Sequence, residues 1–284
     1  MNRPLLVGAQ AVEPNGVTIW GAVRKYFISN GVPMDYALFS TYEALDRALV
    51  GGAIDVAWNA PLAQAQTIIQ SGGACRVLAM RDTDKEVTTV MLVRADSPIQ
   101  SVSDLRGKRL SLGEHDSSEL SLIPRHQLRK DGLDVDSECI VVELESKEYV
   151  PGIRHVELRT IMAALEDGTV DAATLFEPQY RQLVDRGRID AAAHRVLWRS
   201  RPYSHCGFAA RPGLPDDVSG QFVELLTAMD YSSPDIKEMM DLEHLRAWVP
   251  ADASGWDDLV AGVKEANLEG GSWGVSYVVA QPRA

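Results

Sequence analysis

The sequence predicts an α/β protein of two similar lobes, each a mostly parallel sheet flanked by helices. Strand-like and helix-like segments alternate along the 284 residues, which is the order that places helical crossovers between parallel strands. A short pattern of helix end, glycine, aspartate, strand and proline also occurs twice. With 45% hydrophobic and 24% charged residues, the chain has the composition of a soluble globular protein.

The first third of the chain is expected to begin with a strand. Ile19, Val23 and Phe27 have helical spacing, and Gly31 is placed to end that helix. Thr41 is a suitable N-cap for the next helix. The predicted strands cover residues 4–9, 34–39, 54–58, 76–80 and 88–94, and the predicted helices cover residues 17–30, 42–50 and 59–69.

The remaining elements follow the same alternation. A short turn at residues 103–105 is expected to be capped by Ser103, and Pro178 is expected to open a helix, as Pro61 does earlier. Further strands are predicted at residues 109–112, 140–143, 170–176, 196–199 and 207–210, with helices at residues 117–130, 156–166 and 178–185 and a mainly helical C-terminal part.

The repeat consists of residues 48–61 (ALVGGAIDVAWNAP) and 164–178 (ALEDGTVDAATLFEP). Glycine and proline punctuate helices and strands in any α/β protein. Two copies that agree in Gly, Asp and Pro nevertheless favour two related lobes. The matching pairs are Ala48 and Ala164, Gly52 and Gly168, Asp55 and Asp171, and Ala57 and Ala173.

Charge and composition restrict the possible functions. A formal net charge of −12 argues against general nucleic-acid binding, because an acidic surface repels phosphate backbones. No apolar run is long enough for membrane insertion.

The opening MNRPLLVGAQ is not typical of a signal peptide. The sequence as it stands therefore predicts a cytoplasmic protein, or a periplasmic or extracellular one if a leader was removed. Three widely spaced cysteines favour reduced thiols.

Four stretches resemble the substrate-binding proteins of phosphate, phosphite and phosphonate ABC importers. They are SVSDLRGKRLSLGEHDSSELSLIPRHQLRKDGLD (101–134), TYEALDRALVGGAIDVAWNAPLA (41–63), RHVELRTIMAALEDGTVDAATLFEP (154–178) and VLWRSRPYSHCGFAARPGLP (196–215). The resemblance implies a type II periplasmic-binding-protein fold. Residues 1–87 and 205–284 would form lobe one, and residues 88–204 would form lobe two. The chain would cross between the lobes near residues 87–95 and 195–207, with the ligand in the cleft between them.

Ser117 and Ser118 are the leading candidates for an anion cradle. They open a helix after a strand, where hydroxyls, free backbone N–H groups and the helix dipole favour an anion, although one serine could simply be an N-cap. Glu119 follows where the resembling family has a hydroxyl, and a carboxylate there disfavours a fully ionised phosphonate. His115 in the preceding loop could add a donor.

His155 and Glu177 are the candidates that depend most on the resemblance. It places His155 where the family has a ligand-contacting histidine, and Glu177 where phosphonate binders meet an amine. Without the resemblance, Glu177 is a first-turn acid that stabilises a helix N-terminus. In lobe one, Tyr42 and Asn59 are expected to face the cleft, and Trp58 to lie in the core.

His205 and Cys206 lie on the segment that returns to lobe one, which the resemblance places beside the cleft, and His205 is a further ligand-binding candidate. Neighbouring strand residues point to opposite faces, so the two are not expected to contact each other, and a free cysteine is most often a small buried residue. If Cys206 instead met His155 or His115 in space, with Glu119 as a further catalytic candidate, nucleophilic or proton-transfer chemistry would follow.

Two functions therefore remain. The favoured one is a solute-binding or sensing protein for a small anionic or zwitterionic ligand, with an ABC permease as partner if it is exported. The alternative is a cytoplasmic decarboxylase, lyase or hydrolase that uses Glu119, His155, Glu177 and Cys206. The sequence contains no nucleotide-binding or hydrolase motif and no histidine spacing typical of a metal site, so it predicts neither a cofactor nor a metal.

Overall fold

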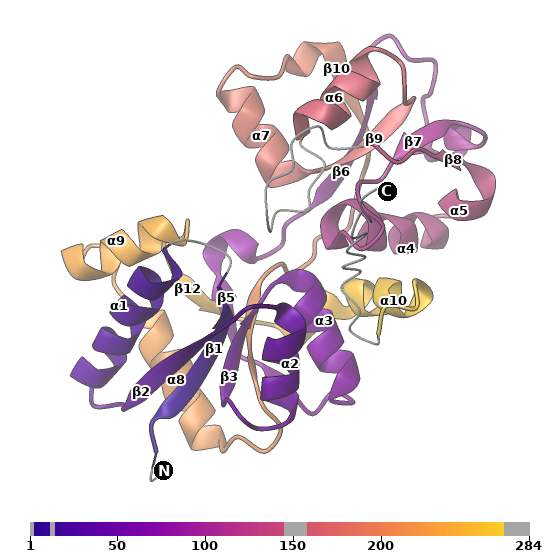
Figure 1. The fold of residues 1–284 in the computed structure, drawn as a ribbon. Coiled ribbons are helices and arrows are strands. Elements are labelled where there is room, and N and C mark those ends of the chain that lie inside the picture. The colour runs from indigo at the N-terminus through magenta and orange to yellow at the C-terminus, as the bar shows by residue number, and fades with distance from the viewer. Residues whose placement is uncertain (1–2, 12–14, 145–157, 270–284) are drawn as a thin grey trace, which may run out of the picture.

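The computed structural model describes residues 3–11, 15–144 and 158–269, which form two lobes, each built on its own five-stranded sheet (Figure 1). Each sheet mixes parallel and antiparallel neighbours. Within these residues, no helix combines the length and apolar character needed to cross a bilayer.

The sheet of the first lobe has the strand order β2-β1-β3-β11-β4. Strands β2, β1 and β3 are parallel, whereas β11 runs antiparallel to both β3 and β4. The strands are β1 (Leu5–Gln10), β2 (Met34–Phe39), β3 (Val56–Asn59), β4 (Arg76–Val77) and β11 (Gly207–Ala210), and β5 (Ala79–Arg81) pairs separately with β12 (Trp248–Pro250). The helices are α1 (Gly16–Ser29), α2 (Tyr42–Val50), α3 (Pro61–Gln70), α8 (Asp216–Thr227) and α9 (Pro234–Leu242).

The core of the first lobe forms because α1 turns one apolar face inward. Trp20 and Phe27 on that face are buried, as the helical spacing predicts. Trp20 meets Phe208 of β11 edge-on, with 6.1 Å between ring centroids, and Phe27 packs against Phe222 of α8 at 5.4 Å. Aromatic contacts of this kind join α1, the sheet and α8 into one core.

The sheet of the second lobe has the order β10-β6-β9-β7-β8. Strand β9 is antiparallel to β6 and parallel to β7. The strands are β6 (Thr89–Arg94), β7 (Arg109–Ser111), β8 (Ile140–Val141), β9 (Ala172–Phe176) and β10 (His194–Arg199), and the helices are α4 (Ile123–Lys130), α5 (Val135–Glu138), α6 (Leu158–Glu166) and α7 (Glu177–Asp185). Shorter helical turns throughout the chain are η1 (Asp82–Asp84), η2 (Val102–Leu105), η3 (Ser118–Leu122), η4 (Ala191–Ala193) and η5 (Ala253–Trp256).

Two segments, residues 82–88 and 200–206, link the sheets and run side by side. Val87 and Tyr203 exchange backbone hydrogen bonds of 2.9 and 3.0 Å in an isolated antiparallel bridge. The Tyr203 hydroxyl also lies 2.8 Å from Oγ1 of Thr89. The two links therefore support each other where the chain passes between the lobes.

Helix α10 (Asp257–Glu265) contacts both lobes and lies between them in Figure 1. It packs on α3 of the first lobe and on α4 of the second. Its Glu265 pairs with His126 and Arg129 of α4. Leu259 and Val263 belong to an apolar cluster that includes side chains of both lobes, such as Leu62 and Ile123.

The structure corrects several predicted boundaries. Residues 76–80 were expected as one strand, but they divide between β4 and β5, which pair with different partners. Residues 117–130 begin as the π-helix η3 and continue as α4, rather than forming one α-helix. Ser101, not Ser103, caps η2, in a capping box with Asp104. Residues 211–269 of the C-terminal part are mainly helical, as predicted, and also contain β12.

Candidate functional site

His205 is the centre of the candidate site, on the second linking segment, and both of its ring nitrogens contact carboxylates. Nε2 lies 2.7 Å from Oε1 of Glu119, and Nδ1 lies 3.1 Å from Oδ1 of Asp84. Burial alone would disfavour a charged ring, but Cys206, Asp84 and Glu119 outweigh it and raise the pKa of His205 well above its ordinary value. The ring is therefore a doubly protonated imidazolium that donates to both carboxylates. We call Asp84, Glu119, His205 and Cys206 the His205 cluster.

Asp84 belongs to η1 on the first linking segment and is held by Arg81. The Arg81 guanidinium bonds both carboxylate oxygens of Asp84, lies near Glu243 and stacks 5.2 Å from the centroid of the Trp58 ring. Burial by itself would raise the pKa of Asp84, but His205 and Arg81 lower it. Asp84 is thus an ionised buried carboxylate between two cations.

Glu119 enters the cluster from the second lobe, in the first turn of η3. Ser117 caps this turn, because its Oγ accepts a 3.1 Å hydrogen bond from the backbone N–H of Leu120. The Ser117 hydroxyl lies 3.3 Å from Oε2 of Glu119. Oγ1 of Thr89 donates to the backbone oxygen of Glu119 at 2.7 Å, which ties the turn to β6.

The imidazole is also held by contacts that involve no charge. The Phe176 ring at the end of β9 stacks on it, with 5.1 Å between centroids and 24° between planes. In the C-terminal part of the chain, Nε1 of Trp256 donates to the backbone oxygen of His205 at 2.9 Å. Both lobes and the C-terminal part therefore place this one ring.

Cys206 contacts His205, contrary to the expectation from its position in the sequence. Its Sγ lies 3.1 Å from Nδ1 of His205. Neighbouring residues point to opposite faces only within a strand. Strand β11 begins at Gly207, so His205 and Cys206 lie in the linking segment, where this expectation does not apply. The thiol is free and partly exposed.

Glu177, predicted to meet a ligand amine, has its carboxylate occupied by protein donors. Thr88, Arg181 and Arg199 all bond it. Burial would raise the pKa of Glu177, but the hydrogen bonds from Arg199, Thr88 and Arg181 outweigh it and lower the pKa to about 2. The carboxylate therefore ties α7 to β10 and to the first linking segment.

The two candidates in the first lobe, Tyr42 and Asn59, lie in different surroundings. Tyr42, at the start of α2, lies near the cluster: burial raises the pKa of its phenol, and Cys206, His205 and Arg81 are close enough to affect that pKa. The prediction that Asn59 faces the cleft is wrong. It is fully buried inside the first lobe, where Nδ2 donates to Oγ1 of Thr67 at 3.2 Å.

The remaining candidates have different positions. Ser118 is buried as the first residue of η3, and His115 is exposed in the loop before it. His155 lies outside the described residues. Sequence reasoning missed Asp84, Arg81 and Phe176. The Arg81–Asp84 spacing suggests a local ion pair, but no local signal shows that the pair faces His205.

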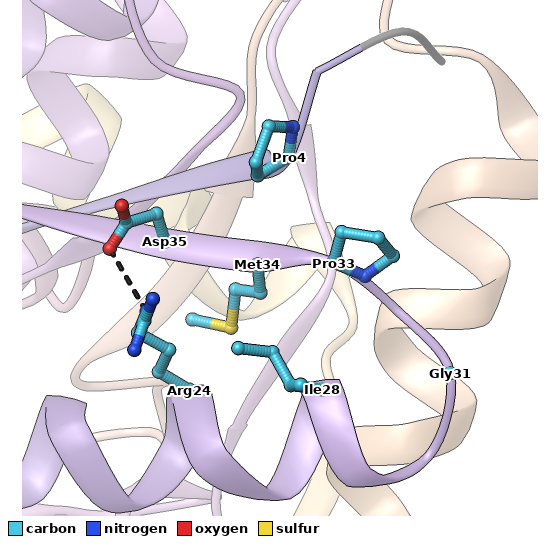
Figure 2. A pocket seen from close by; sticks show the side chains of 7 residues that line it. All are labelled: Pro4, Arg24, Ile28, Gly31, Pro33, Met34 and Asp35. Atoms are coloured by element: carbon cyan, nitrogen blue, oxygen red, sulfur yellow. Dashed lines mark ion pairs between the residues drawn. The ribbon is translucent and has the colours of Figure 1, made fainter.

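A second feature lies at the other end of the first lobe (Figure 2). A hollow of about 330 Å³ is lined by seven residues: Pro4, Arg24, Ile28, Gly31, Pro33, Met34 and Asp35. It lies beside the amino ends of β1 and β2, with the Arg24–Asp35 ion pair across it. Ligands of open α/β sheets bind beyond the carboxyl ends of the strands, so the His205 cluster is the better candidate.

Most of the chain matches a known protein family. Residues 14–256 match the family of ABC transporter phosphonate periplasmic substrate-binding proteins. The chain belongs to this family. A curated relative is the probable ABC transporter phosphite binding protein PhnD1 of Prochlorococcus marinus (strain MIT 9301), which is 20% identical over 216 residues, covering 72% of this chain and 69% of the relative.

Solved structures of similar fold include members of the phosphonate- and sulfonate-binding groups. PhnD1 of Prochlorococcus marinus in complex with methylphosphonate has a TM-score of 0.61 at 17% identity, covering 94% of this chain and 100% of that one. XAC2383 from Xanthomonas citri, bound to ATP, has a TM-score of 0.68 at 19% identity, covering 93% and 98%. The periplasmic aliphatic sulphonate binding protein SsuA of Escherichia coli has a TM-score of 0.54 at 17% identity, covering 94% and 86%. At these identities the likeness shows the fold, a type II periplasmic-binding-protein fold.

Membership of the phosphonate-binding family makes this chain a substrate-binding protein of the ABC-transporter type, whose partners are a small ligand and a permease. The family is periplasmic. Within the described residues, the carboxylate of Glu119 contacts His205.

Proposed function

We propose that this protein binds a small anionic or zwitterionic ligand, phosphonate-like or carboxylate, between its lobes, as a solute-binding or sensing protein. Lobe one would comprise residues 1–87 and 205–284, and lobe two would comprise residues 88–204. The observation that carries the proposal is the contact of Glu119, from the second lobe, with a charged His205 on the segment between the lobes. The family match favours this function over the enzymatic alternative.

The electrostatics of the site support a ligand anion near His205. The capped start of η3 brings backbone N–H groups and a positive helix end close to this cation. Glu119 already supplies one negative charge there. A ligand anion must therefore share His205 with Glu119 or displace it.

This competition indicates the preferred ligand. A dianion such as methylphosphonate meets repulsion from Glu119, whereas a ligand that also carries an ammonium or another donor gains a contact with the same carboxylate. We therefore propose that zwitterions and donor-bearing anions bind more tightly than simple dianions. Tyr42 would close the site from the first lobe.

Calorimetric titration of the full chain tests the proposal. Suitable ligands are methylphosphonate, phosphite, aminoethylphosphonate, a short alkanesulfonate, small amino and hydroxy acids and ATP. Saturable one-to-one binding of at least one is expected, and it should be lost in His205→Gln but kept in Lys25→Gln, a control at an exposed residue of α1. If none binds, or if the two variants behave alike, the assignment is wrong.

Glu119→Ser tests the ligand class. Removing the carboxylate should weaken the binding of a zwitterion and strengthen that of methylphosphonate, each by about 1 kcal/mol for a partly buried charge contact. Strong methylphosphonate binding by the unmodified protein would contradict the preference for zwitterions. Cell fractionation would show whether the chain is exported, as the periplasmic family suggests, and therefore whether a permease can be its partner.

A further inference from the structure

Two side chains of metal-ligating type, those of Asp84 and Cys206, converge on one ring nitrogen of a third, His205. Nδ1 of His205 lies 3.1 Å from Oδ1 of Asp84 and 3.1 Å from Sγ of Cys206. The three ligand atoms all lie within 4.8 Å of one another. We propose that Asp84, His205 and Cys206 form a binding site for a divalent transition metal of the Zn²⁺ or Co²⁺ type.

The spacing suits such an ion. Bonds of about 2.0–2.3 Å from Zn²⁺ to oxygen, nitrogen and sulfur place tetrahedral ligands roughly 3–4 Å apart. Two of the three separations are already close to this range. Small side-chain rotations would therefore bring all three atoms onto one ion. A thiolate, an imidazole and a carboxylate together favour Zn²⁺ and Co²⁺ over Mg²⁺ or Ca²⁺, which prefer oxygen ligands.

Glu119 completes the arrangement from the far side of the ring. Metal-binding histidines commonly donate their second ring N–H to a carboxylate, which fixes the tautomer and directs the other nitrogen to the ion. Glu119 accepts in this way, with Oε1 2.7 Å from Nε2 of His205. It is a positioning residue for the metal and not a ligand.

Two features set the strength of the site. Arg81 shares the Asp84 carboxylate and opposes a second cation, which weakens binding. The ion must also displace the proton on Nδ1 of His205 and the thiol proton of Cys206. Three protein ligands leave a fourth position for water or for an anionic oxygen of a ligand, as in open zinc sites. The inference does not depend on the proposed ligand, because the metal alone is the probe.

Cobalt titration of the reduced, chelator-treated full chain tests the site by absorption spectroscopy. One equivalent of Co²⁺ should produce a saturable thiolate-to-cobalt charge-transfer band, which Zn²⁺ then removes. Cys206→Ser should abolish the band, whereas Cys139→Ser, at a partly exposed thiol far from the cluster in sequence, should keep it. Glu119→Gln should weaken Co²⁺ binding by about tenfold or more.

Alkylation of the unmodified chain provides a test that needs no variant. Zn²⁺ should protect Cys206, but not Cys139, from iodoacetamide, as measured by peptide mass spectrometry. A band that never saturates, a band that survives Cys206→Ser, or equal protection of both cysteines would overturn the proposal. Failure to bind the small anions of the preceding section would leave this result unaffected.

Discussion

Asp55 and Asp171 are the same position in the two halves of the repeat, and they make the same backbone contact in different surroundings. Asp55 accepts from the backbone N–H of Leu6 at 3.0 Å, and Asp171 accepts from that of Arg109 at 2.8 Å. Each thereby joins two parallel strands, β1 to β3 in the first lobe and β7 to β9 in the second.

The difference lies in burial and in the number of arginines. The Asp55 side chain is 0% exposed and pairs with Arg3 and Arg211, whereas that of Asp171 is 28% exposed and pairs with Arg109. The local motif therefore determines the strand contact, and the surroundings determine how much each carboxylate contributes to stability.

Asp55→Asn should have the largest effect. It removes a fully buried charge that faces two guanidinium groups, and breaking such pairs costs about 3 kcal/mol or more. Urea denaturation should show this loss in the free energy of unfolding. A loss no greater than that of Asp171→Asn would mean that burial does not distinguish the two copies.

Two other buried carboxylates, one in each lobe, should give opposite pH dependence. Burial raises the pKa of Asp46 to about 7, although a hydrogen bond from Thr67 lowers it. In the unfolded chain Asp46 ionises at a lower pH than in the folded protein. As pH rises towards about 7, proton loss therefore favours the unfolded chain and lowers the free energy of unfolding. Asp46→Asn should therefore raise the free energy of unfolding at about pH 8 and change it little at about pH 4.

Glu177 should behave in the reverse way. Its pKa of about 2 in the folded protein lies below the ordinary value of 4.5, so its stabilisation is present above about pH 4.5 and is lost as pH falls towards 2. Glu177→Gln should lower stability near neutral pH, and the difference from wild type should shrink on acidification. Parallel pH profiles for the Asp46 and Glu177 variants would show that at least one of the two assignments is wrong.

Gly8 and Ser111 are also equivalent, since they pair with Ala57 and Ala173 of the repeat. A Cβ at Gly8 would lie 2.5 Å from Cδ1 of Ile54, so Gly8→Ala should cost about 1–2 kcal/mol by overpacking.

The buried hydroxyl of Ser111 has no hydrogen-bond partner among the described residues. Ser111→Ala should therefore be neutral or slightly stabilising, and thermal melting of both variants would check this.

Asp171→Asn should cost much less stability than Asp55→Asn. The Asp171 carboxylate is partly exposed, and its hydrogen bond from Arg109 lowers its pKa. Such pairs contribute about 0.5–1 kcal/mol, less at high salt. Denaturation with and without salt should show a small, salt-sensitive loss, in contrast to the large loss expected for Asp55→Asn.

Much of the fold followed from local pattern. Glycine, proline and Thr41 punctuate the chain where helices begin or end, and the Thr41 cap is confirmed by its 3.2 Å hydrogen bond from Ala44. Pro61 and Pro178 both lie in the first turn of a helix. The sequence could not show that residues 76–80 divide between two sheets, because that depends on which distant strand pairs with each half.

The site was only partly predictable. The sequence by itself determined the cap at Ser117, the acid at Glu119 and the helix start at Glu177, since each depends on residues a few positions away. Only the tertiary structure decided that Glu119 meets His205 across 86 residues, that Asp84 meets it across 121, and that Asn59 turns into the core. Contacts at such separation depend on how sheets and linking segments pack together, and packing leaves no periodic signal in the sequence.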